Sequence, residues 1–349
     1  MVKWIGFRML RTAIAVWAIA SVVFLLSRQD TARAEQLALP DATDLSGYAV
    51  GTPVARQAAR EAVRQRLGLN LPLFYISRAA GKWYWNGLQN QYHHWLRRAV
   101  QGDFGQSFRT SQPVTEALLA ALPYSLPLTG TALLLAAGAA LAMGQRLAAR
   151  PRWQQPVRTI LAALQALPLF VVALILLLAF ANPEMLAWFP AYGLTQSVDV
   201  ELSVWSRTST YLMHMALPVI ALALTALPEL ALQLDAALTE ELRTDYATTA
   251  RAKGLAEGVV IRRHALRNAL LPTLTQLAEL LPALVGGAVV VEVVFALPGM
   301  GRLLTEAAAA RDYPVLVGGV LLAGTARLLA LLLADLLYFW ADPRIRWPS

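Results

Sequence analysis

Five charged residues lie within or at the edges of long apolar stretches, where charged side chains are rare: Glu229, Glu279, Glu292, Arg327 and Asp335. A charge near the bilayer centre costs roughly 2.5–3.5 kcal/mol on insertion scales, so such groups usually face a protein interior or form pairs. Glu279 is the most central of them. It either lines a pathway that attracts a cation or an amino group, or pairs with Arg327 or a partner subunit.

No pattern typical of a catalytic site accompanies these charges. The chain has no cysteine, which excludes disulfides, thiolate metal sites and cysteine nucleophiles. The patterns GxxxxGK[ST], HExxH, GxSxG and SxxK are absent. His93 and His94 are adjacent, so they point to different faces of a helix or strand, and we expect no metal site there. The sequence therefore predicts a protein that is not an enzyme and takes energy from a partner or an ion gradient.

The apolar stretches are long enough to cross a membrane. The 349 residues are 57% hydrophobic and 15% charged, whereas soluble domains carry about 25% charged residues. Glu116 and Arg146 enclose 29 uncharged residues, and long gaps also follow Arg158 and Arg207. An apolar run of about 18 residues or more is typical of a transmembrane helix. Six spans are predicted, over residues 12–26, 126–147, 159–181, 211–232, 274–295 and 315–339.

Lysine and arginine are distributed unevenly around these spans. With the N-terminus inside, the inner segments carry fifteen of the 30 basic residues and the two short outer loops carry three. The long outer stretch is left out, because loops above about 60 residues escape the positive-inside rule. Both termini are therefore predicted to be cytoplasmic, and the net charge of +8 reflects topology rather than nucleic-acid binding. A cleavable signal peptide ending near residues 32–34 is the alternative for the first span.

The spans divide the chain into three parts. Residues 1–27 form the N-terminal segment and first span, 28–120 an external region, and 121–349 a five-helix core. The longest cytoplasmic loop, 233–272, lies within the core, and we expect two short helices there. Gly254 should join them, since glycine ends helices in a left-handed conformation. Asp245 should cap the first.

Aromatic side chains gather in the external region. They occur at Trp83, Tyr84, Trp85, Tyr92 and Trp95. Tryptophan and tyrosine are enriched at membrane interfaces, which is the first interpretation. Contact with a transported substrate is the alternative.

The cytoplasmic loop carries the most specific patterns in the chain. Residues 245–255 read DYATTARAKGL, and residues 264–272 read HALRNALLP. Both resemble the permease subunits of ATP-binding-cassette importers for dipeptides and oligopeptides, a family that also includes nickel and glutathione permeases. Further matches follow the family's order: LGLNLP at 67–72, GDFGQS at 102–107, VEVVFALPGMGR at 291–302, RDYPV at 311–315 and DPRIR at 342–346.

The resemblance implies an all-α membrane protein with the type I importer permease fold. Six transmembrane helices, an external insertion between the first and second, and a cytoplasmic coupling-helix loop between the fourth and fifth are expected. It also implies an inner-membrane location and no cofactor. Its partners would be a second, different permease subunit, two cytoplasmic ATPase subunits and a periplasmic solute-binding protein.

The matched motifs also imply two sets of site residues. Coupling to the ATPase is expected of Asp245, Tyr246, Ala250, Arg251, Lys253, Gly254, Leu255, His264, Arg267, Asn268 and Pro272. A place in the translocation pathway or its gate is expected of Glu279, Glu292, Phe295, Pro298, Gly299 and Gly301.

Several alternatives remain open at this point. The loop either docks a cytoplasmic partner or only sets orientation, and Arg251 either pairs with an ATPase carboxylate or only orients the loop. Glu292 serves a gate or the structure. An ion-gradient-driven secondary transporter with Glu279 as proton carrier is the rival function, and a membrane-bound enzyme with its site in residues 28–120 is a third.

Overall fold

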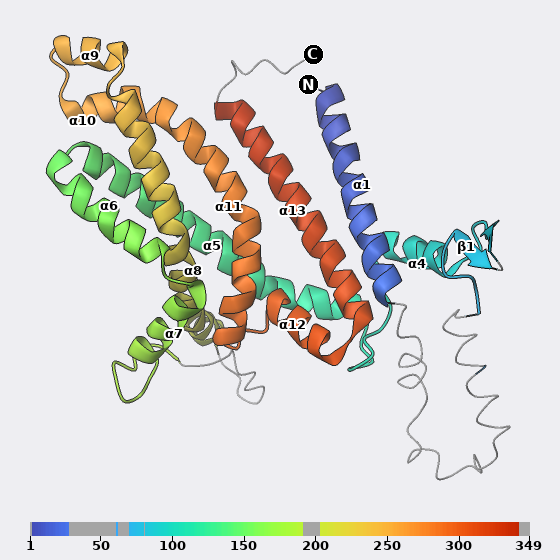
Figure 1. Cartoon of the computed structure of the whole chain (residues 1–349). Helices are drawn as coiled ribbons and strands as arrows, with labels where there is room; N and C mark the ends of the chain where they lie inside the picture. Colours follow the sequence, from blue (N-terminus) through green and yellow to red (C-terminus); the bar gives the residue numbers. More distant parts are fainter. Residues whose placement is uncertain (1, 28–60, 62–69, 80, 191–202, 342–349) are drawn as a thin grey trace. The chain divides into compact units, whose positions relative to one another are not determined.

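The computed structural model describes residues 2–27, 61, 70–79, 81–190 and 203–341 (Figure 1). The side chains of Glu279, Arg327 and Asp335 lie outside the described ones, so the expectations about their contacts are not tested. The chain divides into two compact units. The first comprises the described residues of Met1–Ala120 and Glu306–Thr325, and the second those of Ala121–Thr305 and Ala326–Ser349.

The first unit combines helices with a short hairpin. Helix α1 (Val2–Ser27) contains the first predicted span. Strand β1 (Ile76–Ala79) pairs antiparallel with β2 (Lys82–Trp85). The turn between them passes through Gly81 at φ +80°, a conformation that glycine adopts readily. The fold is therefore mostly helical, and the hairpin corrects the expectation that it is all-α.

The predicted aromatic cluster separates into a buried and an exposed part. Tyr92, on α4 (Gln91–Val100), is fully buried, and its ring centroid lies 5.3 Å from that of Phe24 on α1. The Tyr92 hydroxyl is 2.6 Å from Ser21 Oγ, which satisfies both polar groups. These contacts tie α4 to α1, so this part of the cluster is a structural core.

The exposed part lies on strand β2. Trp83 and Trp85 are two residues apart and therefore share one face of the strand, where they are 72% and 71% exposed. The Arg78 guanidinium lies 5.8 Å from the Trp83 ring centroid. A membrane-interface position for this face remains a prediction, as does the substrate-contact alternative.

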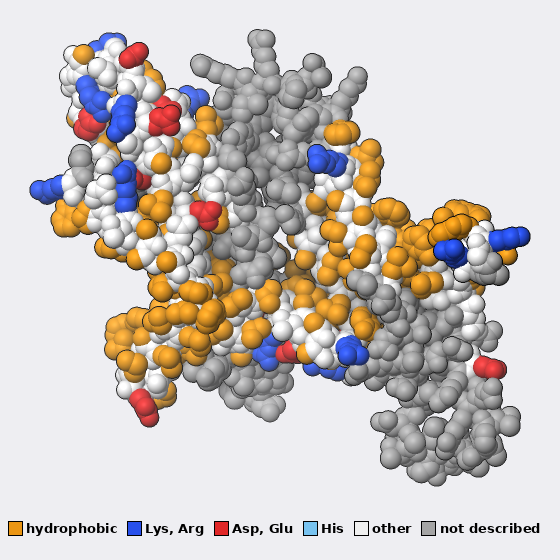
Figure 2. All heavy atoms as spheres, in the orientation of Figure 1, with side chains coloured by type: hydrophobic (Ala, Val, Ile, Leu, Met, Phe, Trp, Pro, Cys, Tyr) orange, Lys and Arg blue, Asp and Glu red, His pale blue; other side chains and the backbone are white. Residues whose placement is uncertain are grey.

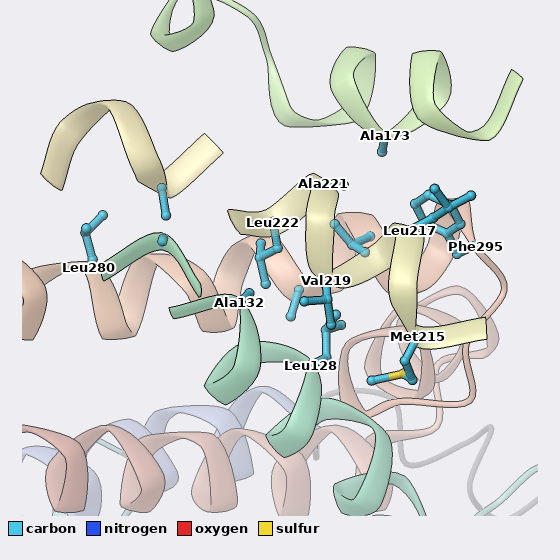
Figure 3. Packing of buried hydrophobic residues seen from close by; sticks show 14 of the residues in the cluster. Leu128, Ala132, Ala173, Met215, Leu217, Val219, Ala221, Leu222, Leu280 and Phe295 are labelled. Atoms are coloured by element: carbon cyan, nitrogen blue, oxygen red, sulfur yellow. The ribbon is translucent and has the colours of Figure 1, made fainter. Parts of the chain in front are cut away.

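The second unit is a helical core. Its main helices are α5 (Val114–Ala148), which starts in the first unit, α6 (Pro151–Gln165), α7 (Leu169–Phe180), α8 (Val204–Glu241) and α11 (Leu266–Val294). Two more helices, α12 (Met300–Ala310) and α13 (Tyr313–Ala341), belong partly to each unit. Figure 3 shows side chains from α5, α7, α8 and α11, with Phe295 just after α11, gathered in one apolar cluster.

Two described helices, α5 and α8, are each long and apolar enough to cross a membrane. A third crossing results if α6 and α7 form one span. These two helices are bent by 97° at a break, so the apolar stretch predicted as the third span over 159–181 is not one straight helix. Pro168, the N-cap of α7, explains the break: it has no N–H to donate and disfavours helical geometry at the residue before it.

Helix α8 runs nine residues past Leu232, where the fourth span was predicted to end. Its extension buries Asp235, whose Oδ2 accepts a hydrogen bond of 2.5 Å from Arg158 Nε on α6. The first charged residues after an apolar stretch indicate where a span leaves the membrane, but the helix itself can continue beyond them. The pair joins α6 to α8 and offsets part of the cost of burying the Asp235 carboxylate.

Candidate functional site

The segment between α8 and α11 forms a compact element, which we call the elbow (residues 242–265). It contains α9 (Asp245–Ala252), α10 (Glu257–Val259) and the π-helical turn η1 (Val260–Ala265). Figure 1 shows α9 beyond the ends of α8 and α11. Gly254 lies between α9 and the three-residue α10, which continues directly into η1.

Gly254 ends α9 in the way that the sequence predicted. Its φ is +80°, and its N–H donates to the Arg251 carbonyl at 2.9 Å. The next N–H, of Leu255, donates to the Ala250 carbonyl at 3.3 Å. This pair of bonds is the Schellman motif, which satisfies carbonyls that the helix end would leave unpaired. A residue with a side chain at position 254 would be strained in this conformation.

The start of α9 differs from the prediction. Thr244, not Asp245, is the N-cap, and its hydroxyl donates to the Glu241 carbonyl at 2.6 Å instead of accepting from the helix. Asp245 is the first residue of α9, where a negative charge is favourable near the positive end of the helix dipole. The sequence TDYATT (244–249) allows either Thr244 or Asp245 to be the N-cap. The position at which α8 ends, Glu241, decides between them.

One face of α9 is buried against the elbow itself. Ala247 and Ala250, three residues apart, are 0% and 5% exposed and pack on Val260 of η1. Ala250 was expected to contact an ATPase. Its small side chain lets α9 lie close to η1, and the ATPase contact of Ala250 stays a prediction.

Arg251 forms hydrogen bonds with two other parts of the elbow. Its Nε and Nη2 donate to the two carboxylate oxygens of Glu257 at 3.0 and 2.7 Å, and its Nη1 donates to the Leu242 carbonyl at 2.9 Å. These bonds hold the pKa of Glu257 below its ordinary value. Arg251, on α9, thereby connects the first residue of the elbow, Leu242, with α10. The geometry favours the alternative in which Arg251 orients the loop.

A second set of hydrogen bonds fixes the elbow to the long helices. The Tyr246 hydroxyl donates to the Glu241 carboxylate at the end of α8, and Asn268 Nδ2 on α11 lies 3.3 Å from the same hydroxyl. Burial and the bond to Glu241 raise the pKa of Tyr246, so the hydroxyl stays protonated and donates. Movement of α9 must therefore carry the ends of α8 and α11 with it.

Other expected coupling residues face outward. Lys253 and Leu255 are exposed on either side of the Gly254 turn, and Leu255 is a large apolar side chain. His264 is half-buried, whereas Arg267 and Pro272 are exposed on the way into α11. Figure 2 shows charged side chains gathered around α9 and α10. The elbow thus presents a mixed apolar and basic tip on a fixed base.

The second expected set lies at the turn from α11 to α12. Glu292 is fully buried, its Oε1 accepts from Ser125 Oγ at 2.6 Å and its Oε2 accepts from the Arg302 N–H at 3.0 Å. Ser125 Oγ in turn accepts from the Met300 N–H at 2.7 Å. The carboxylate therefore satisfies the first N–H groups of α12, as an N-cap would. This arrangement favours the structural interpretation of Glu292 over the gate.

The glycines of this motif allow the close approach. A Cβ at Gly299 would overlap the Glu292 carboxylate, and one at Gly301 would overlap Val289 of α11. Phe295 is 3% exposed and anchors the turn in the core, while Pro298 is exposed. The motif VEVVFALPGMGR thus encodes a tight reversal. Among its residues, only the exposed ones are placed to touch another molecule.

A similar carboxylate organises the first unit, although no role was predicted for it from the sequence. Asp312, 3% exposed, accepts from Ser107 Oγ at 2.5 Å and from the Phe108 N–H at 3.1 Å. Arg109 also pairs with Glu306 at 3.0 Å. The matched patterns at 102–107 and 311–315 are therefore two halves of one structural contact. A buried acid within a motif was the signal available for it.

Comparisons with known proteins agree with this architecture. Residues 132–347 match the model of the family described as "Binding-protein-dependent transport system inner membrane component". A solved structure of the inward-facing MetNI methionine ABC transporter superposes with a TM-score of 0.52 at 17% identity, covering 67% of this chain and 100% of that chain. This likeness shows the fold.

Curated relatives are similar over most of their length. The oligopeptide transport system permease protein AppB of Bacillus subtilis (strain 168) is 34% identical over 298 residues, covering 84% of this chain and 87% of the relative. The dipeptide transport system permease protein DppB of Alkalihalophilus pseudofirmus is 33% identical over 325 residues, with coverages of 87% and 91%. The glutathione transport system permease protein GsiC of Escherichia coli O1:K1 / APEC is 33% identical over 300 residues, with coverages of 85% and 88%.

These relatives are permease subunits of transport systems and not enzymes, and they give no support to the ion-gradient alternative. The family model alone covers more than half of the chain. The chain therefore belongs to the family of inner membrane components of binding-protein-dependent transport systems.

Proposed function

We propose that this chain is one of two permease subunits of an importer for dipeptides or oligopeptides. Two ATPase subunits would drive it from the cytoplasm, and a periplasmic solute-binding protein would deliver the cargo. The peptide transport systems among the relatives support this cargo class. Heteromeric pairing with a different permease remains our expectation from the resemblance.

The observation that carries the proposal is the elbow. Helix α9 is held by the Arg251–Glu257 ion pair and is hydrogen-bonded to the ends of α8 and α11. It is therefore suited to transmit a displacement by a partner to these two helices. Its exposed tip, Lys253 and Leu255, can pair with an acidic group and fill an apolar groove on an ATPase. Such a contact would couple closure of the ATPase pair to movement of α8 and α11.

We further propose six spans with both termini in the cytoplasm. The described lengths of α1, α11 and α13 are compatible with crossings in addition to α5, α8 and the bent pair α6 and α7. The division into 1–27, an external region 28–120 and a core 121–349 with a coupling loop at 233–272 belongs to this proposal. Glu279 remains the proposed pathway carboxylate.

Energy dependence tests the function. The chain, reconstituted with its ATPase subunits, its second permease and its solute-binding protein, is expected to take up radiolabelled dipeptide only with ATP, and vanadate should stop it. A catalytic-glutamate variant of the ATPase is the matched control and should reduce uptake to background. Uptake that persists without ATP and follows a proton gradient would overturn the proposal.

Site-directed cysteine labelling tests the orientation. Because the chain has no cysteine of its own, only the introduced thiol can react. Lys253→Cys and Arg207→Cys each introduce a single exposed thiol, on the elbow and at the start of α8. In intact spheroplasts an impermeant maleimide should label Arg207→Cys, and it should label Lys253→Cys only after lysis. The reverse pattern would place the elbow outside and contradict the coupling role.

A further inference from the structure

A cavity of about 720 Å³ lies beside the end of α5 in the second unit. One wall is formed by the last turns of α5 and the residues after it, and the other by Gly258, Ile261 and Arg262 of the elbow. A volume of this order is typical of sites for small organic ligands. The lining therefore decides what the cavity can bind.

The lining is strongly basic. Arg146, Arg150 and Arg262 all contribute to it, and no carboxylate does among the described residues. Among the described residues, the only one of these three guanidinium groups with a hydrogen-bond partner is that of Arg262, whose Nε donates to the Gly258 carbonyl at 3.1 Å. The negative end of the α5 dipole is equivalent to about half a charge, so it cannot balance three guanidinium groups. The three guanidinium groups, all of them exposed, therefore favour an anion over a neutral or cationic ligand.

The rest of the lining is mostly apolar: apart from Gln145 it consists of Gly138, Leu141, Ala142, Ala149, Gly258 and Ile261. Gly138, Leu141, Ala142 and Gln145 line the cavity at helical spacing, along one face of α5. This face leads from the charged end of the helix into the stretch of 29 residues without charge that precedes Arg146. The cavity therefore straddles the boundary between the apolar phase and water. A soluble anion would use only its basic rim.

We propose that this cavity binds the head group of an anionic phospholipid. The phosphate would accept hydrogen bonds from Arg146, Arg150 and Arg262, and the acyl chains would follow the face of α5 that carries Leu141 and Ala142. Arginine forms bidentate hydrogen bonds with phosphate oxygens, and basic pockets at helix ends recognise such head groups.

The site connects lipid to the elbow. Its second wall begins at Gly258, directly after Glu257, the residue that Arg251 clasps. A phosphate held between Arg146 and Arg262 would join α5 to η1 and resist separation of the two. The inference does not depend on the cargo, because it concerns residues of this chain and a lipid.

Binding of fluorescent phosphatidylglycerol to the purified full-length chain in neutral detergent tests the inference. Arg146→Gln combined with Arg150→Gln should raise the apparent Kd by about tenfold, since two cationic contacts with phosphate are lost. Arg152→Gln combined with Arg243→Gln is the matched control: both residues are exposed and basic, neither lines the cavity, and the Kd should stay within about twofold.

Two further arms identify the source of the phosphate. Ala142→Trp fills the apolar part of the cavity and leaves the three arginines unchanged. It should weaken lipid binding without altering binding of inorganic phosphate. Millimolar inorganic phosphate should not displace the lipid, and phosphatidylcholine should compete poorly. Equal losses in the control pair, full displacement by inorganic phosphate, or equal affinity for phosphatidylcholine would each overturn the inference.

Discussion

Replacing Glu292 with alanine is expected to destabilise the chain by about 3 kcal/mol or more. The carboxylate is fully buried and accepts from the Ser125 hydroxyl and the N–H of Arg302. Each buried donor left without an acceptor costs roughly 1–3 kcal/mol, and the lost side chain leaves a cavity. Thermal unfolding of the purified chain in detergent should show a clear fall in midpoint temperature.

Two controls separate this structural role from a role in the pathway. Glu292→Gln keeps the size and one acceptor, so it should lose less than half as much stability. Glu184→Ala removes an exposed carboxylate and should leave unfolding unchanged. A Glu292→Ala variant that unfolds at the wild-type temperature yet abolishes transport would show that the carboxylate acts on the cargo and not on the turn.

Reversing the charge at position 251 by Arg251→Glu is expected to reduce ATP-driven uptake by more than tenfold. The introduced carboxylate would face that of Glu257 where an ion pair now joins α9 to α10, and the bond to the Leu242 carbonyl would be lost as well. The pair is only partly buried, so its value lies in geometry more than in free energy of folding. Uptake in proteoliposomes, together with copurification of the ATPase subunits, measures the effect.

The exchange Arg251→Glu with Glu257→Arg discriminates between the two roles of Arg251. If the residue orients the elbow, the exchange rebuilds the ion pair and should restore a substantial fraction of uptake. Lys253→Glu should weaken copurification of the ATPase subunits without loosening the elbow. Failure of the exchange, combined with full activity of Glu257→Ala, would mean that Arg251 pairs with the ATPase directly.

Features that depend on neighbouring residues were predictable from the sequence. Gly254 lies between two polar helical segments, and only a residue tolerant of positive φ ends a helix as it does. The burial of Ala250 could also have been read, because Ala247 lies one turn away on the same face. The sequence pattern could not decide whether Thr244 or Asp245 is the N-cap, since both residues cap helices well.

Features that depend on distant residues were not predictable. Glu292 meets Ser125, which lies 167 residues earlier in the chain, and Asp312 meets Ser107 across a gap of 205. Hydropathy predicted the bounds of the third span but not the angle at its break, because it measures apolar character and not backbone direction. The 97° break at Pro168 follows from the ring's geometry, and only its tertiary surroundings decide between a kink and a full turn.

The length of α8 determines how far α9 lies from the membrane on the proposed topology. At 1.5 Å per residue its 38 residues extend about 57 Å, against a hydrocarbon layer of about 30 Å. On the proposed topology the nine residues after Leu232 place the end of α8, and the start of α9 that follows it, about 14 Å from the edge of that layer. This standoff exceeds the thickness of the lipid head groups, about 5–8 Å on each side. An ATPase subunit bound to the start of α9 would therefore contact this chain beyond the lipid head groups.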